Sequence, residues 1–227
     1  MVSMNAIRYQ ILGSEYIGVF ATVTEKYIFI GNSISQNTKI LLSSTLSTTV
    51  ISTAIGGSDM VGLFMRGNSN GIVLSNLATE REVKALKEIL PNVSIGIVDS
   101  VINAVGNDIL ANDKIALVNP DYDKKVQQEI SDILDVETIP ISAGNFSVIG
   151  ASNTLTNKGM AINNRVSDRE KAIIDKIVGF ESMRVTANFG SMGIGLSILA
   201  NSKGAVVGGN TTGYEFARIL EALNIKE

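Results

Sequence analysis

Two short apolar runs flank a polar three-residue turn at five places along the chain. In the second place, the turn Asn68-Ser69-Asn70 is followed by the apolar run Ile72-Val73-Leu74. Two strand-like runs across a turn rich in Asn, Asp, Ser or Gly predict a β-hairpin. The five turns are Thr24–Lys26, Asn68–Asn70, Asn112–Lys114, Thr156–Lys158 and Asn201–Lys203.

A segment with apolar residues at helical spacing follows each hairpin. In residues 79–90, TEREVKALKEIL, Thr79 and Glu82 have the spacing of a capping box, which marks a helix start. The first such segment, SQNTKILLSSTLS, is the poorest helix former because it is rich in Ser and Thr. The apolar positions that define the other four helices are Val83, Leu86, Ile89 and Leu90; Val126, Ile130, Ile133 and Leu134; Ile173, Ile174, Ile177 and Val178; and Phe216, Ile219, Leu220 and Leu223.

The five places form an internal repeat of about 44 residues. Each begins at one of the glycines Gly18, Gly62, Gly106, Gly150 and Gly195. A third β-branched run closes each of the first four units and begins with Ile51, Ile95, Ile139 or, in the fourth unit, the segment MRVTA.

The fifth unit lacks this third strand, but Ile7 lies eleven residues before Gly18, the same spacing as in the other units. We therefore predict an α+β fold. Five pseudo-symmetric β-β-α-β units form a closed ring, an α-β propeller in which the N-terminal strand completes the fifth unit. Residues 1–227 are expected to be a single domain of five repeats, because no linker interrupts the period.

The composition suits an ordered protein, with 45% hydrophobic and 18% charged residues. No run of eighteen apolar residues and no signal-peptide pattern occurs, so we expect no membrane association and a cytoplasmic location. The formal net charge is −3 without a dense basic segment, which argues against binding to free nucleic acid and favours a basic protein partner.

The absence of cysteine and histidine excludes several kinds of chemistry. Cysteine nucleophiles, serine–histidine pairs, disulfides and metal sites built on thiolate or imidazole are impossible. We expect no catalytic residues, no metal site and no cofactor.

One stretch nevertheless resembles an acid-rich active site, GNDILANDKIALVNPDYD at residues 106–123. Its acids and amides are of the kinds that chelate a hard cation or act as an acid–base pair. The repeat assigns Asn112 and Asp113 to a hairpin turn, and Asp121 and Asp123 to the start of a helix. The stretch also lacks the ligand spacing of an EF-hand.

Departures from the repeat remain as functional candidates. Asn107 follows the unit glycine where the sister units carry Val19, Leu63, Ala151 and Leu196, and Asp108 comes next. Arg66 aligns with Thr22, Leu110, Thr154 and Leu199. The alternative is neutral drift at exposed positions. Our candidate binding residues are Asn107, Leu63, Arg66 and Asp108.

Two glycine-rich segments have simpler explanations. GSMGIG, residues 190–195, precedes a hairpin rather than opening a helix, so it does not fit a dinucleotide-binding loop. GGNTTG, residues 208–213, is interpreted as a turn with a helix N-cap.

The predicted ring resembles the pentein fold and, within it, the translation initiation factor six family of archaea and eukaryotes. The resemblance spans roughly residues 7–223 and is strongest in the third unit. The matching motifs are Gly106-Asn107, Asn112-Asp113, Ala116-Leu117-Val118 and Pro120-Asp121 with Asp123, and the turns with Gly67-Asn68 and Thr156-Asn157.

This resemblance implies a non-enzymatic factor. Such proteins bind the intersubunit face of the large ribosomal subunit, mainly through ribosomal proteins near the sarcin–ricin loop. They thereby prevent joining of the small subunit. The length of the chain favours an archaeal member, and we expect a monomer.

Two alternatives remain open at this point. Other pentein proteins are guanidino-modifying enzymes, but they depend on a Cys and a His that this chain lacks. The third hypothesis is a passive small-molecule binder, which would require a deep pocket at the centre of the ring.

Overall fold

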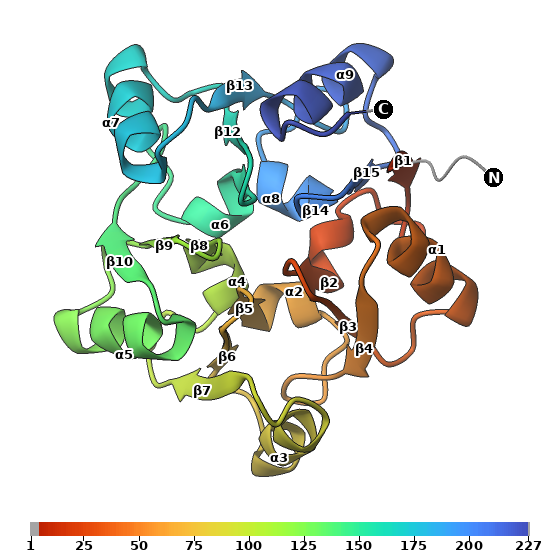
Figure 1. The fold of residues 1–227 in the computed structure, drawn as a ribbon, viewed down its shortest axis with the longest axis vertical. Helices are drawn as coiled ribbons and strands as arrows, with labels where there is room; N and C mark the ends of the chain where they lie inside the picture. Colours follow the sequence, from red (N-terminus) through yellow and green to blue (C-terminus); the bar gives the residue numbers. More distant parts are fainter. Residues whose placement is uncertain (1–4, 227) are drawn as a thin grey trace.

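The five predicted hairpins are present and are arranged around a central axis in a computed structural model that describes residues 5–226 (Figure 1). Each hairpin pairs two antiparallel strands. The hairpins are β2 (Ala21–Val23) with β3 (Tyr27–Gly31), β5 (Met65–Gly67) with β6 (Gly71–Ser75), β8 (Ile109–Ala111) with β9 (Ile115–Val118), β11 (Thr154–Leu155) with β12 (Met160–Asn163), and β14 (Ile198–Ala200) with β15 (Ala205–Gly208).

A third strand joins each hairpin in parallel and completes a three-stranded sheet. The third strands are β4 (Thr49–Thr53), β7 (Ser94–Val98), β10 (Glu137–Pro140), β13 (Met183–Val185) and β1 (Ala6–Tyr9). β1 pairs with β15 with Ala6 opposite Ala205, so the N-terminal strand completes the fifth unit as predicted.

Helices form the outside of the ring (Figure 1). A capping side chain starts each one, for example Ser35, whose hydroxyl accepts a hydrogen bond from the Thr38 N–H. Asp123 caps its helix in the same way, as predicted. Ile89 and Ile173 lie in helices as their spacing predicted, and they are 55% and 48% exposed. The outer helices are α1 (Gln36–Leu46), α3 (Glu80–Ile89), α5 (Lys124–Leu134), α7 (Asp168–Val178) and α9 (Gly213–Ala222).

Each core is shared by two consecutive units, so no unit has a complete core of its own. The cluster around α1 contains Leu42 and Leu46 of the first unit and Leu199 and Val206 of the fifth. The cluster around α3 likewise includes Phe29 from the preceding unit. Since unit-by-unit folding would expose these residues, we expect the ring to unfold cooperatively as one domain.

Short helical turns surround the axis (Figure 1) and bring the repeat glycines together. A Cβ atom on Gly62 would overlap the carbonyl oxygen of Gly18, and one on Gly106 would overlap that of Gly62. Gly150, Gly195 and Gly18 continue this series around the axis. The turns are η1 (Ile17–Val19), α2 (Val61–Phe64), α4 (Val105–Asp108), α6 (Ile149–Ser152) and α8 (Ile194–Ser197).

The ring closes through these contacts and through packing of the inner strands, because the five sheets remain separate. It is therefore not a closed β-barrel. Neighbouring inner strands such as β2 and β5 touch, but no strand pairing joins the sheets within residues 5–226.

Three glutamates hold the loops that lead into the axial turns. Glu82, three residues after the N-cap of α3, accepts hydrogen bonds from the N–H groups of Gly56 and Gly57 at 2.9 Å. Glu170 accepts one from Gly144, and Glu215 accepts those of Phe189 and Gly190. Each glutamate therefore caps its helix and fixes the adjacent loop.

Burial raises the pKa of Glu215, but hydrogen bonds from Thr212, Thr186 and Gly190 outweigh that effect and hold the pKa below its ordinary value of 4.5. The pKa of Glu82 is lowered by the same balance of burial against hydrogen bonds. For Glu170, hydrogen bonds from Ser167 are the main cause of the lowered pKa.

We predict that Gly106→Ala lowers the free energy of unfolding by about 3 kcal/mol, because a methyl group there overlaps backbone that cannot move aside. Urea denaturation measures this loss. Gly213→Ala is the matched control: its Cβ meets nothing within 4 Å at the first position of α9, so its stability should stay equal or rise by about 0.5–1 kcal/mol. Equal stability of both variants would contradict this role of the axial glycines.

We predict that Glu215→Gln destabilises the protein at pH 7 and that the deficit shrinks as the pH falls below about 4.5. The folded-state pKa is below the unfolded value, so the ionised carboxylate stabilises the fold above that value and this stabilisation is lost on acidification. Denaturation of both proteins between pH 3 and 7 measures the difference. Glu88→Gln, at an exposed position of α3, serves as control. A deficit that is constant with pH would show that the charge is irrelevant.

Candidate functional site

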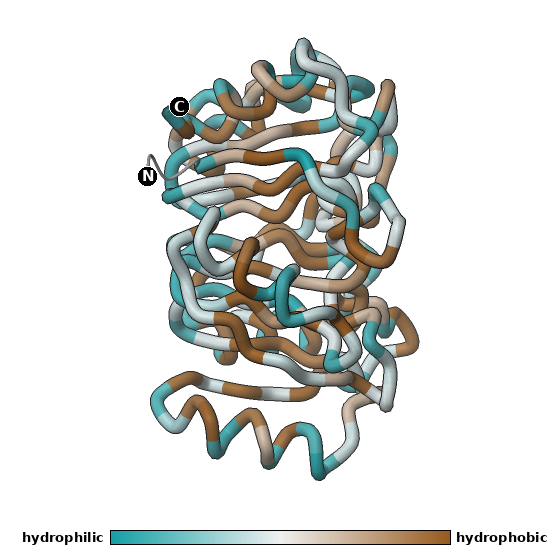
Figure 2. The backbone as a smooth tube through the Cα atoms, turned by 90° about the vertical axis from the view of Figure 1, so that its right-hand side faces the viewer, coloured by the Kyte–Doolittle hydropathy of each residue, from teal (hydrophilic) through white to brown (hydrophobic). Residues whose placement is uncertain are grey.

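The ring has two faces with different chemistry. Each inner strand runs from an axial turn to a hairpin turn, so these features lie at opposite ends of the strands. We call the end with the five hairpin turns the turn face. The opposite end, the loop face, is formed by loops 10–16, 54–60, 99–104, 141–148 and 186–193 and by the shorter loops that precede the outer helices. In side view, the left edge, where the termini lie, is mostly hydrophilic, whereas hydrophobic segments reach the right edge (Figure 2).

The polar residues of the turn face bind one another. The Asp113 carboxylate accepts hydrogen bonds from the N–H and hydroxyl of Ser69 at 2.7 and 2.9 Å, and from the amide of Asn157 at 2.7 Å. The Glu25 carboxylate likewise accepts hydrogen bonds from the N–H and the hydroxyl of Ser202. The acids of the turns therefore connect neighbouring units, and this is the role of Asp113 in the acid-rich stretch.

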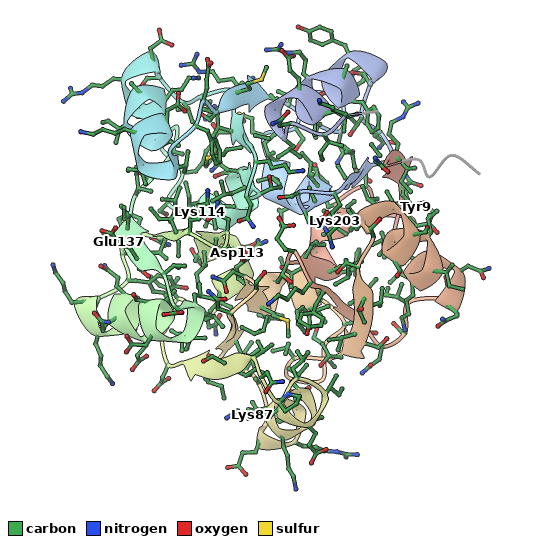
Figure 3. The ribbon with its side chains drawn as sticks, in the orientation of Figure 1. Tyr9, Lys87, Asp113, Lys114, Glu137 and Lys203 are labelled. Carbon is green, nitrogen blue, oxygen red and sulfur yellow. The ribbon has the colours of Figure 1, made fainter. Side chains whose placement is uncertain are left out.

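Lysines complete this circle of contacts. The Lys26 ammonium donates to the Ser69 carbonyl, and that of Lys158 donates to the Ser202 carbonyl. With the two carboxylates, these bonds link all five turns. Figure 3 shows Asp113, Lys114 and Lys203 near the centre of this face. Most polar groups of the turns are thus already used inside the ring.

The loop face, by contrast, exposes large apolar side chains. Val101 is 98% exposed, Phe189 83% and Leu12 65%. Tyr16, Met60 and Leu77 are also exposed there. Large exposed apolar side chains that gather on one face of a folded protein favour an interaction site on that face.

The charge of these loops is negative. They carry five acids and one base, and the base, Arg165, lies over the ring of Phe146 at 5.8 Å from its centroid. Charge complementarity would suit a basic partner. The acids are Glu15, Asp59, Asp99, Asp121 and Asp123.

Two bulky residues of this face adopt a strained backbone. Leu12 has φ +52° and Phe189 has φ +64°, in the left-handed region that favours glycine. The second unit places Gly56 and Gly57 in the corresponding turn. An exposed side chain at a strained position costs about 1–3 kcal/mol, and such sites concentrate where a protein functions.

These two residues belong to neighbouring loops at the seam between the fifth and first units. The Asn188 amide donates to the Glu15 carbonyl at 3.0 Å, and a Cβ on Gly193 would touch the ring of Tyr16. We call Leu12, Tyr16 and Phe189 the seam patch. Our sequence analysis missed it, although comparison of the loops could have identified it from a large residue in a glycine-type turn.

The predicted binding residues divide into two pairs. Asn107 and Leu63 are half-buried on the axial turns α4 and α2. The Asn107 side-chain carbonyl is buried and has no hydrogen-bond partner. These two residues keep part of their surface accessible, as a binding role requires.

Arg66 and Asp108 point into the ring instead. The Arg66 guanidinium lies in the interior, although part of the residue reaches the surface, and donates to the Gly106 carbonyl at 2.5 Å. Asp108 is 3% exposed and accepts a hydrogen bond from the Asn119 amide at 2.7 Å. Burial raises the pKa of Asp108, and the bond from Asn119 opposes that rise only in part.

The centre of the ring is nearly filled. Its two axial cavities measure about 20 Å³ each, room for about one water-sized group apiece. An organic ligand does not fit there, which counts against the passive-binder hypothesis. Among residues 5–226, no group of three or more Asp and Glu side chains could hold a metal ion. No helix in this range combines the length and apolar character needed to cross a membrane.

Several known proteins are similar to this chain over nearly its whole length. The eIF-6 family model matches residues 6–222. Translation initiation factor 6 of Methanosarcina acetivorans is 37% identical over 217 residues, which cover 96% of this chain and 97% of that protein. The proteins of the same name from Saccharolobus islandicus (strain L.S.2.15) and Picrophilus torridus are 34% and 33% identical, over 97% and 94% of this chain and 99% and 97% of their own.

Proposed function

Because the chain belongs to the eIF-6 family and is thus a translation initiation factor, we propose that it binds the intersubunit face of the large ribosomal subunit. Bound there, it blocks association with the small subunit. The partners are mainly ribosomal proteins near the sarcin–ricin loop, and the protein acts as a monomer in the cytoplasm.

The observation that carries the proposal is the loop face. It combines exposed apolar side chains with net negative charge, which complements the basic proteins of a ribosome. The turn face uses its polar groups within the ring, so it has less to offer a partner. A standard interface buries about 800 Å² on each partner, a small part of the 9983 Å² surface described.

Within this face, we place the contacts at the seam patch and at Asn107 and Leu63. Aromatic side chains supply much of the binding energy of interfaces, and the backbone N–H of Phe189 donates a hydrogen bond to the Glu215 carboxylate. Arg66 and Asp108 support the axial turn that carries Asn107 rather than touching a partner directly.

A non-enzymatic role fits the centre of the ring. The cavity around Arg66 is lined by Leu110, Leu155 and other apolar residues, without a carboxylate or a nucleophile other than the Thr154 hydroxyl. Guanidino-modifying chemistry therefore has no acid there to assist it. We expect no hydrolysis of arginine derivatives by the pure protein.

We predict that the purified protein co-sediments with large ribosomal subunits and not with small ones, and that it lowers the yield of joined ribosomes. Sucrose-gradient sedimentation of purified archaeal subunits with and without the protein measures both effects. Binding to neither subunit would refute the proposal. Binding without loss of joined ribosomes would refute the blocking mechanism alone.

We predict that Phe189→Gly weakens binding to large subunits at least about tenfold, because it removes the exposed anchor. The same change should leave the free energy of unfolding equal or up to about 1 kcal/mol higher, since glycine relieves the positive φ. Asn107→Ala should weaken binding roughly threefold to tenfold without unfolding the ring.

Ile173→Ser is the control for both variants, because Ile173 is 48% exposed on α7, outside the loop face. The Ile173→Ser variant should bind large subunits with the affinity of the wild-type protein. Unchanged affinity of Phe189→Gly and Asn107→Ala would move the interface to another part of the protein.

A further inference from the structure

The centre of the ring contains a buried positive charge without a counter-ion. Arg66 lies on β5 at the position that three sister units fill with Leu110, Thr154 and Leu199, all of which line the same axial cavity. A guanidinium thus extends into a space that these units fill with apolar or hydroxyl side chains. Buried charges in proteins are normally paired, because removing them from water is costly.

The hydrogen bonds of Arg66 leave its charge uncompensated. One Nη atom donates to the Gly106 carbonyl at 2.5 Å, and the other lies 3.5 Å from the Thr22 hydroxyl, at the limit of a hydrogen bond. Nε is buried and has no partner. Both acceptors are neutral, and within residues 5–226 no carboxylate forms an ion pair with Arg66.

Arg66 remains charged in this environment. Burial lowers its pKa to about 10, which still leaves the guanidinium protonated near neutral pH. The cavity beside it is formed by residues of all five units, so it lies on the axis of the ring. A fixed positive charge therefore borders this small cavity, and the buried Nε of Arg66 has no partner among residues 5–226.

The size of the cavity decides which ligand fits. About 20 Å³ holds roughly one atom-sized group, so sulfate, phosphate and carboxylate-bearing metabolites are too large. The other polar groups are few. Asn153 already bonds Ile149, Ser152 and Asn163, whereas the Thr154 hydroxyl makes only a 3.5 Å contact to the Ile194 carbonyl and is free to turn.

We propose that Arg66 holds a single halide ion, chloride under cellular conditions, in the axial cavity, with the Thr154 hydroxyl as a second donor. The ion neutralises the guanidinium and connects the second and fourth units across the axis. This proposal is independent of ribosome binding, since it concerns only the interior of the ring.

Two carboxylates near the axis lie at a different cavity from Arg66. Glu25 and Asp113 line the second cavity, on the turn face, together with the amides of the hairpin turns. Both carboxylates keep their charge, because Ser202, Ser69 and Asn157 are neutral donors. Neither carboxylate forms an ion pair with Arg66, and burial alone lowers the pKa of Arg66. The halide site is therefore confined to the cavity that Arg66 lines.

Crystals of the full chain soaked in sodium bromide test the site directly. The expected result is an anomalous difference peak at hydrogen-bond distance from Arg66 Nε and near Thr154 Oγ1. A peak that refines as water and shows no anomalous signal would overturn the proposal. This test needs no variant, so it does not depend on the stability of a mutant.

A solution measurement compares melting temperatures in 1 and 300 mM sodium chloride, with sodium gluconate keeping the ionic strength equal. The wild-type protein should gain at least about 3 °C, whereas Arg66→Leu should gain nothing. Leucine is the residue of two sister units at this position, so the variant is expected to fold. Arg165→Leu, at an exposed arginine, should keep the wild-type response. Equal responses of Arg66→Leu and wild type would refute the site.

Discussion

Backbone contact between the axial glycines is the constraint on which the whole ring depends. Each glycine lies against the carbonyl of the preceding one, and Gly18 lies against Gly195, so the series closes on itself. This contact sets how closely the five units approach, and any side chain larger than hydrogen would push two units apart. The shared cores and the circle of hydrogen bonds between the turns both require that spacing.

The two ends of the inner strands have different roles: the turn face stabilises the ring, and the loop face carries the candidate binding residues. At the turn face, Asp113, Glu25 and the lysines form hydrogen bonds with neighbouring units, so these polar groups have partners within the ring. At the loop face, strained and apolar residues face the solvent, although this costs stability. The shared cores and the turns therefore hold the ring together, and the loop face presents the candidate binding surface.

Much of this fold could be predicted from sequence because it is repeated. The glycine period, the hairpin turns and the helical spacing recur five times, and Ile7 occupies the place of the strand that the last unit lacks. A weak signal for one element in one unit is therefore supported by the same element in the other units. The candidate site was harder to predict from sequence. Asn107 departs from the repeat and is partly accessible, but Arg66 and Asp108 depart from it and are turned inward. A departure indicates a special environment without saying which way the side chain points.

Composition and the glycine period do not point to Phe189. Comparison of the repeated loops shows a large residue in a glycine-type turn, but the positive φ and the exposure of Phe189 are fixed only by the folded backbone. Asp113 gives the opposite case: its turn was predicted, but its bonds to the neighbouring units link residues 44 positions apart in sequence.

The pairing of β1 with β15 also affects how the chain folds during its own synthesis. β1 is made early, but its partner follows about 200 residues later, so the ring cannot close before β15 has been made. Until then, the apolar side of the first unit that packs against Leu199 and Val206 is uncovered. The nascent chain therefore carries an exposed strand edge until β15 is available, and this is the stage at which a chaperone would protect it.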